Sequence, residues 1–97
     1  IGVLTMRFSL AGNTSLKGKR KVAQSLKQKL RNRFNLAVAE VDAQDEHQTL
    51  VLAAVTVAND TPTVESRLHK AMGHAEAAAD AELVDCSTEV FSDTDET

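Results

Sequence analysis

Aromatic residues and cysteine are scarce in this sequence of 97 residues, which has three phenylalanines, no tryptophan, no tyrosine and one cysteine. A single cysteine cannot form an internal disulfide, and this fits a reducing cytoplasm, where we expect the protein to reside. Without strand tryptophans or tyrosines, the chain lacks the usual means of stacking RNA bases on an open sheet. There is no run of about 18 apolar residues, so no membrane-spanning helix is predicted. A signal peptide is not expected either, because no apolar stretch follows a charged start.

Acidic residues are missing from the first 39 positions, and this absence is the most informative one. Residues 1–39 hold nine of the eleven lysines and arginines. Residues 40–97 hold all fourteen aspartates and glutamates and the other two basic residues. The two segments therefore carry formal charges of +9 and −12, which give the net charge of −3. Such asymmetry predicts an interaction surface of defined sign.

The spacing of apolar residues predicts six elements within a single domain that spans residues 1–97. Alternating or continuous apolar residues predict strands over residues 1–10, 36–42, 50–58 and 83–91. Helical spacing predicts helices over residues 16–34, with Ser15 as the N-cap, and from Pro62 to about residue 80. The third strand is apolar on both faces, which suits a central position. Residues 92–97 are expected to form a frayed acidic tail.

The order strand, helix, strand, strand, helix, strand predicts the fold class. With right-handed crossovers, this order gives an α+β fold of the ferredoxin-like βαββαβ type. Its four strands form an antiparallel sheet, and its two helices cover one face of that sheet. This layout serves many unrelated functions, so the fold alone does not identify one.

Two short motifs resemble the signatures of a known family. Residues 15–20 read Ser-Leu-Lys-Gly-Lys-Arg and resemble an S-L-K-x-K-R signature, and residues 33–41 resemble the signature R-F-N-x-x-V-A-E-V. Both are similar to motifs of a small bacterial family usually called YlxP-like, a domain of unknown function. The resemblance spans nearly the whole chain and implies a ferredoxin-like fold. Genes of this family often lie beside genes for translation initiation and ribosome-maturation factors, which implies a role near the ribosome.

The predicted first helix carries eight cations and no acid, although several local effects oppose this composition. Pairs such as Lys17 and Lys21 place like charges four residues apart, which costs about 0.2–0.5 kcal/mol each. Four cations crowd the first turns, where the helix dipole is already positive. Gly18 adds a propensity cost of about 1 kcal/mol relative to alanine. Unfavourable choices that gather at one place tend to mark function.

We therefore hypothesise that the first helix binds RNA or a ribosomal surface. Residues spaced by three and four line one stripe of this helix, and the free backbone N–H groups at its start form a natural anion site. The predicted phosphate contacts are Lys17, Lys19, Arg20, Lys27 and Arg31, with Lys21 and Arg7 in support.

Other interpretations of the basic helix remain open. Its face can simply be solvated, or be neutralised by acids of the second helix such as Glu65, Glu76 and Asp80. A second functional hypothesis is a protein-interaction module whose basic helix binds an acidic partner, including another copy of the chain. The apolar third strand also suggests that the open sheet face is covered by a second copy in a homodimer.

Chemistry at a catalytic, metal or cofactor site is not predicted, and no small-molecule substrate is identified. His69 and His74 are five residues apart, which does not align two imidazoles on one helical face. There is no cysteine pair for a structural zinc site and no glycine-rich phosphate loop. Cys86 is expected to be a small buried thiol. Glu40 is expected to pair with a cation such as Arg7 or Arg33, or to lie at the sheet edge.

Overall fold

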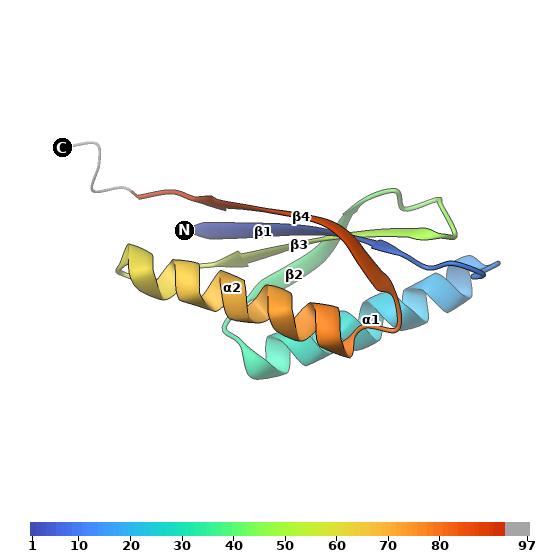
Figure 1. The fold of residues 1–97 in the computed structure, drawn as a ribbon, viewed down its shortest axis with the longest axis horizontal. Helices are drawn as coiled ribbons and strands as arrows, with labels where there is room; N and C mark the ends of the chain where they lie inside the picture. Colours follow the sequence, from blue (N-terminus) through green and yellow to red (C-terminus); the bar gives the residue numbers. More distant parts are fainter. Residues whose placement is uncertain (93–97) are drawn as a thin grey trace.

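A computed structural model describes residues 1–92 of the chain (Figure 1). The elements, in chain order, are β1 (Gly2–Ser9), α1 (Leu16–Arg33), β2 (Ala37–Asp42), β3 (Thr49–Thr56), α2 (Thr61–Ala78) and β4 (Glu82–Val90). Every predicted element is present, and each end lies within two residues of its predicted position. The ferredoxin-like α+β prediction is therefore confirmed. The predicted acidic tail lies outside the described residues, apart from Ser92.

The four strands form one antiparallel sheet in the order β2-β3-β1-β4. Strand β3 lies between β1 and β2, so the central position predicted from its two apolar faces is confirmed. Strands β2 and β4 form the two edges. Both helices lie on the same side of the sheet and leave its other face open (Figure 1). Neither helix has the length and apolar composition that a membrane span requires, over the residues that the structure describes.

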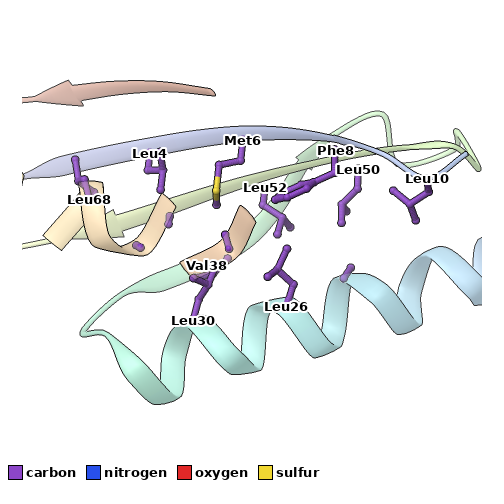
Figure 2. Close-up of a cluster of buried hydrophobic side chains, with 14 of the residues drawn as sticks. Leu4, Met6, Phe8, Leu10, Leu26, Leu30, Val38, Leu50, Leu52 and Leu68 are labelled. Atoms are coloured by element: carbon purple, nitrogen blue, oxygen red, sulfur yellow. The ribbon is translucent and has the colours of Figure 1, made fainter. Parts of the chain in front are cut away.

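The hydrophobic core lies between the sheet and the two helices (Figure 2). The alternating residues Leu4, Met6 and Phe8 of β1 are fully buried, and they pair across the sheet with equally buried residues of β3. Helix α1 contributes Leu26 and Leu30, both at most 1% exposed. The remaining large side chains of the core include Leu50, Leu52, Val64 and Leu68. The strand and helix periodicities of the sequence thus meet in one apolar layer.

Each helix begins at a side-chain cap. The Ser15 hydroxyl accepts a hydrogen bond from the backbone N–H of Gly18 at 3.0 Å, so the predicted N-cap of α1 is confirmed. The Asp60 carboxylate accepts in the same way from the N–H of Thr63 at 3.1 Å, and Pro62 lies in the first turn of α2. These caps satisfy N–H groups that have no partner within the helix.

Strand β4 extends beyond the cover of α2. Eight of its nine residues are exposed, including Cys86, whose side chain points to the helix side of the sheet like that of its neighbour Met6 on β1. The expectation of a buried thiol is therefore wrong. The physical reason is that β4 is an edge strand, and the buried residues of α2, such as Leu68 and Ala71, are directed away from its outer margin into the core. The Cys86 thiol donates a hydrogen bond to the Met72 sulfur at 3.2 Å.

Core packing predicts a large effect of truncating Leu26. We expect Leu26→Ala to lower the free energy of unfolding by about 2–5 kcal/mol, because it removes a buried side chain and leaves a cavity. Urea denaturation followed by circular dichroism measures this change. The exposed Gln24→Ala on the same helix is the matched control and should change stability by less than about 0.5 kcal/mol. Equal effects of the two substitutions would contradict this account of the core.

Candidate nucleic-acid interface

The loop before α1 packs closely against the first turn of the helix. The side-chain amide of Asn13 donates to the Ser15 carbonyl at 2.8 Å and also to the His47 carbonyl. A Cβ atom at residue 18 would overlap the Asn13 side-chain oxygen, so only glycine allows this approach. The glycine that seemed to be a cost in the helix therefore has a packing role, and it no longer counts as a sign of anion binding.

Lys19 lies inside the protein, with only 2% of its surface exposed. Its ammonium group forms an ion pair with the Glu40 carboxylate at 2.9 Å and donates to the carbonyls of Ala43 and Glu46. The prediction that Lys19 contacts phosphate is wrong, because its side chain is enclosed and its charge is balanced. A signal for this burial was present in the sequence. Lys19 precedes Ala23, Leu26 and Leu30 by four, seven and eleven residues, so it lies on the apolar stripe of α1.

Glu40 is the partner that the sequence analysis did not identify. We expected a pair with Arg7 or Arg33, or a place at the sheet edge. Glu40 does lie on the edge strand β2, but its cation is Lys19. Because Lys19 belongs to the motif at residues 15–20 and Glu40 to the motif at residues 33–41, this ion pair joins the two motifs in space.

Five cations of α1 have no ion pair and no side-chain hydrogen bond within residues 1–92: Arg33 at the end of the helix, and four that we call the basic face, Lys17, Arg20, Lys21 and Lys27. Three residues of the basic face are exposed and Lys27 is half-buried. Within residues 1–92, Lys19–Glu40 is the one ion pair. Neutralisation by Glu65, Glu76 or Asp80 is therefore not observed among these residues. The basic face consists of positions that lie away from the buried stripe of the helix.

Two further cations of α1 donate hydrogen bonds to backbone carbonyls of neighbouring elements. The guanidinium of Arg31 donates to the Val38 carbonyl of β2 at 2.7 Å, and the ammonium of Lys29 donates to the Ala78 carbonyl at the end of α2 at 3.2 Å. Arg31 remains exposed, but one of its donors is already committed. Its predicted role as a phosphate contact is accordingly secondary to that of the basic face.

Arg7 is not part of the same surface as α1. Its neighbours across the sheet are Val51 and Asp85, and its side chain points to the open face because Met6 and Phe8 point into the core. The structure therefore separates Arg7 from the basic face by the thickness of the sheet. The prediction that it supports the same contact as Lys17 and Arg20 is wrong, since strand alternation directs it to the opposite side.

The sequence analysis overlooked two cations on α2. Arg67 and Lys70 line a shallow pocket with Phe34, the residue that follows α1. The Arg67 guanidinium is fixed by hydrogen bonds to the Thr56 hydroxyl at 2.6 Å and the Val57 carbonyl at 3.3 Å. One turn further along α2, His74 contacts the Phe34 ring edge-on, with 5.8 Å between ring centroids. The i, i+3 spacing of Arg67 and Lys70 was the available signal for a second cationic strip.

One group of acidic residues lies on the other side of the molecule, whereas another lies on β2 and the β2–β3 connection, near α1: Glu40, Asp42, Asp45 and Glu46. Strand β4 carries Glu82, Asp85 and Glu89 and no cation. It forms one edge of the sheet, whereas β2, the strand against which α1 packs, forms the other edge. On α2, Glu65 lines a groove with residues of β4, whereas Arg67 faces the end of α1. Charge is thus partly sorted, with eight cations on α1 and three acids on β4 at the far edge of the sheet.

These features define a small ferredoxin-like domain with a basic first helix and an acidic sheet edge. The chain belongs to the family described as Protein of unknown function (DUF503), which matches residues 1–88, so the resemblance to a family of unknown function is confirmed. A de novo designed protein, Ferredog-Diesel, is similar in structure at 11% sequence identity and a TM-score of 0.42, over 92% of this chain and 83% of that chain. No curated protein matches the sequence.

The Lys19–Glu40 pair predicts strong coupling between its two residues. We expect Lys19→Met to lower the free energy of unfolding by about 2–3 kcal/mol, somewhat less than for a fully buried pair because Glu40 is partly exposed. Glu40→Leu should cost more, because it leaves a buried ammonium group without its counter-charge. The double variant should be more stable than the sum of the two single losses predicts, as a double-mutant cycle in urea would measure. Strict additivity would contradict the pairing.

Proposed function

We propose that the protein is an accessory factor of translation that binds RNA, or an RNA-bearing surface of the ribosome, through the basic face of α1. The observation that supports this most is the absence of acidic partners for Lys17, Arg20, Lys21 and Lys27 within residues 1–92. The family that the two motifs resemble, with its gene neighbourhood beside ribosome-maturation factors, points to translation.

A phosphate backbone fits the physical character of this face. Cations that repel one another along a helix gain most from a polyanion that neutralises several of them and releases its counterions. Helix α1 has 18 residues and is therefore about 27 Å long at 1.5 Å per residue, which spans several phosphates. The scarcity of exposed aromatic rings favours contacts to phosphate and sugar over stacking on bases.

Neutralising the basic face should abolish RNA binding. We expect a variant with Lys17, Arg20, Lys21 and Lys27 all changed to glutamine to lose binding to a fluorescently labelled RNA hairpin in an anisotropy titration. The unchanged protein should lose roughly a hundredfold in affinity between 50 and 200 mM salt, because about four phosphates are neutralised. Any weak binding that the variant keeps should change little with salt.

A matched control separates a specific face from net charge. The changes Gln44→Glu, Thr61→Glu, Ala77→Glu and Ser87→Glu alter the net charge by the same −4 at exposed positions outside α1. We expect this control to bind the hairpin with near-normal affinity. If both variants lose affinity equally, binding follows net charge and the basic face has no special role.

An acidic protein is the alternative partner of the basic face, and one experiment distinguishes it from RNA. A tagged chain is used to capture ribosomal material from a lysate, with and without nuclease treatment. Recovery that requires intact RNA supports the proposal. Recovery that survives nuclease, yet is lost in the variant with four glutamines, identifies an acidic protein partner instead.

The open sheet face supports a homodimer as the second element of the proposal. On β2 and β3 its rows consist of small and apolar side chains, among them Ala37, Ala39, Ala53 and Val55. Strands β1 and β4 add Arg7, Asp85 and Glu89 to the same face. Val41 and Val55 are 52% and 38% exposed, and no helix covers this side (Figure 1). We propose that a second copy covers this face, because a contiguous apolar surface is costly to leave in water.

A charge on the apolar β2–β3 part of this face should prevent dimerisation. We expect Val55→Asp to yield a monomer, because pairing two copies would bury two unpaired carboxylates. Light scattering coupled to size-exclusion chromatography measures the mass, and Val55→Thr is the control that keeps the shape without the charge. A monomeric mass for the unchanged protein at high concentration would contradict the dimer.

A further inference from the structure

The two edges of the sheet differ in how much of their backbone is free. Strand β2 has six residues and an irregular register near Glu40 and Asp42, and Arg31 occupies its Val38 carbonyl. Strand β4 has nine residues, nearly all exposed, with a single irregularity near Val84 that leaves Asp85–Val90 regular. Natural proteins usually block exposed edges, because an unpaired edge is a template for a further strand. On β4 the blocks are the irregularity near Val84 and the charges of its acidic residues, and among the described residues no side chain is hydrogen-bonded to the backbone of Asp85–Val90.

The register of β4 identifies which backbone groups point outward. Ile1 and Phe91 exchange two hydrogen bonds, from the Ile1 amine to the Phe91 carbonyl at 2.9 Å and from the Phe91 N–H to the Ile1 carbonyl at 2.7 Å. In an antiparallel ladder, such hydrogen-bonded pairs alternate with pairs whose N–H and C=O groups point away. Val90, Thr88 and Cys86 are therefore the residues that present their backbone groups to the outside of the sheet.

The two sides of this edge offer different surroundings to an added strand. On the helix side, Cys86, Thr88 and Val90 line a groove with Leu68 and Met72 of α2, which suits apolar side chains. Toward the open face, β4 presents the side chains of the residues that alternate with Cys86, Thr88 and Val90. These are Asp85, Ser87 and Glu89, which lie beside Arg7, Thr5 and Val3 of β1. Carboxylates on that side suit basic side chains.

The charge of this segment also indicates which occupant is favoured. Residues 82–92 contain three acidic residues, Glu82, Asp85 and Glu89, and no lysine or arginine. Pairing the β4 strands of two copies would bring these acids together, which is unfavourable. A basic segment brings the opposite charge. Alternation of basic and apolar side chains in that segment would match the acidic side and the groove side of β4 at once.

We propose that the β4 edge binds an extended basic peptide segment of a partner protein as a fifth strand of the sheet. Backbone hydrogen bonds to Cys86, Thr88 and Val90 hold the segment, its basic side chains lie beside Asp85 and Glu89, and its apolar side chains enter the groove against α2. This surface lies at the edge far from the β2 side where α1 packs, so the inference is independent of the proposed RNA contact.

The test uses the full chain and a fluorescein-labelled peptide of eight residues in which lysine and valine alternate. We expect binding in an anisotropy titration, and a loss of about tenfold or more in Thr88→Pro, which removes an outward N–H group but no bond to β1. Thr88→Val keeps that N–H group and should bind normally. Asp85→Asn together with Glu89→Gln should weaken binding and reduce its salt dependence.

Modified peptides keep the inference testable even if Thr88→Pro is poorly folded. One peptide carries N-methyl groups on its valine amides and another on its lysine amides, so that the protein itself is unchanged. Loss of binding with valine methylation indicates an antiparallel fifth strand, and loss with lysine methylation indicates a parallel one. If both methylated peptides bind as well as the parent, or if Thr88→Pro is folded and binds normally, the inference is wrong.

Two further outcomes distinguish peptide binding at β4 from RNA binding at α1 and from dimerisation through β4. The variant with four glutamines on α1 should keep peptide binding, and Thr88→Pro should keep RNA binding, so that one surface can fail without the other. A chain that is dimeric, becomes monomeric in Thr88→Pro and ignores the peptide would show that a second copy occupies the β4 edge. That result would overturn the proposed partner.

Discussion

The ammonium group of Lys19 is the contact on which the arrangement around α1 depends. It lies between the helix and the β2–β3 connection, where it meets one carboxylate and two backbone carbonyls. Burying a charge is tolerable only with such partners. Because β2 and the β2–β3 connection hold the Lys19 side chain, they fix the first turns of α1 against the edge strand. Lys17, Arg20 and Lys21 are then directed to solvent. The burial of one cation therefore determines the presentation of its neighbours.

Seven of the eight cations of helix α1 fall into three groups, and Arg33 has no ion pair or side-chain hydrogen bond within residues 1–92. Lys19 is a structural tie, whereas Lys29 and Arg31 satisfy carbonyls at the end of α2 and on the edge strand β2. The basic face has no comparable task within the described residues. The composition of α1 does not distinguish these cations from one another, but their contacts in the structure do. A count of positive charges on the helix consequently overstates the number available to a ligand.

Most of the fold could be predicted from the sequence, because periodicity reports which face of an element is buried. The alternation of Leu4, Met6 and Phe8 predicted β1 and its core side, and Ser15 predicted the start of α1. The site was predicted less well. The position of Lys19 on the apolar stripe of α1 indicates burial, but the sequence does not show that Glu40 lies opposite it, because that contact is tertiary. Cys86 was expected to be buried because the sequence does not tell how far a helix covers an edge strand.

The basic face of α1 and the acidic strand β4 lie toward opposite edges of the sheet. This arrangement gives the molecule a direction, although Asp45 and Glu46 lie near the start of α1. A body that is positive at one end and negative at the other experiences a torque in the field of a polyanion, so it turns while it approaches. Helix α1 would arrive first, and the acidic margin at β4 would be repelled to the far side. Long-range orientation of this kind raises the rate of productive encounters and leaves the distal strand unobstructed after contact.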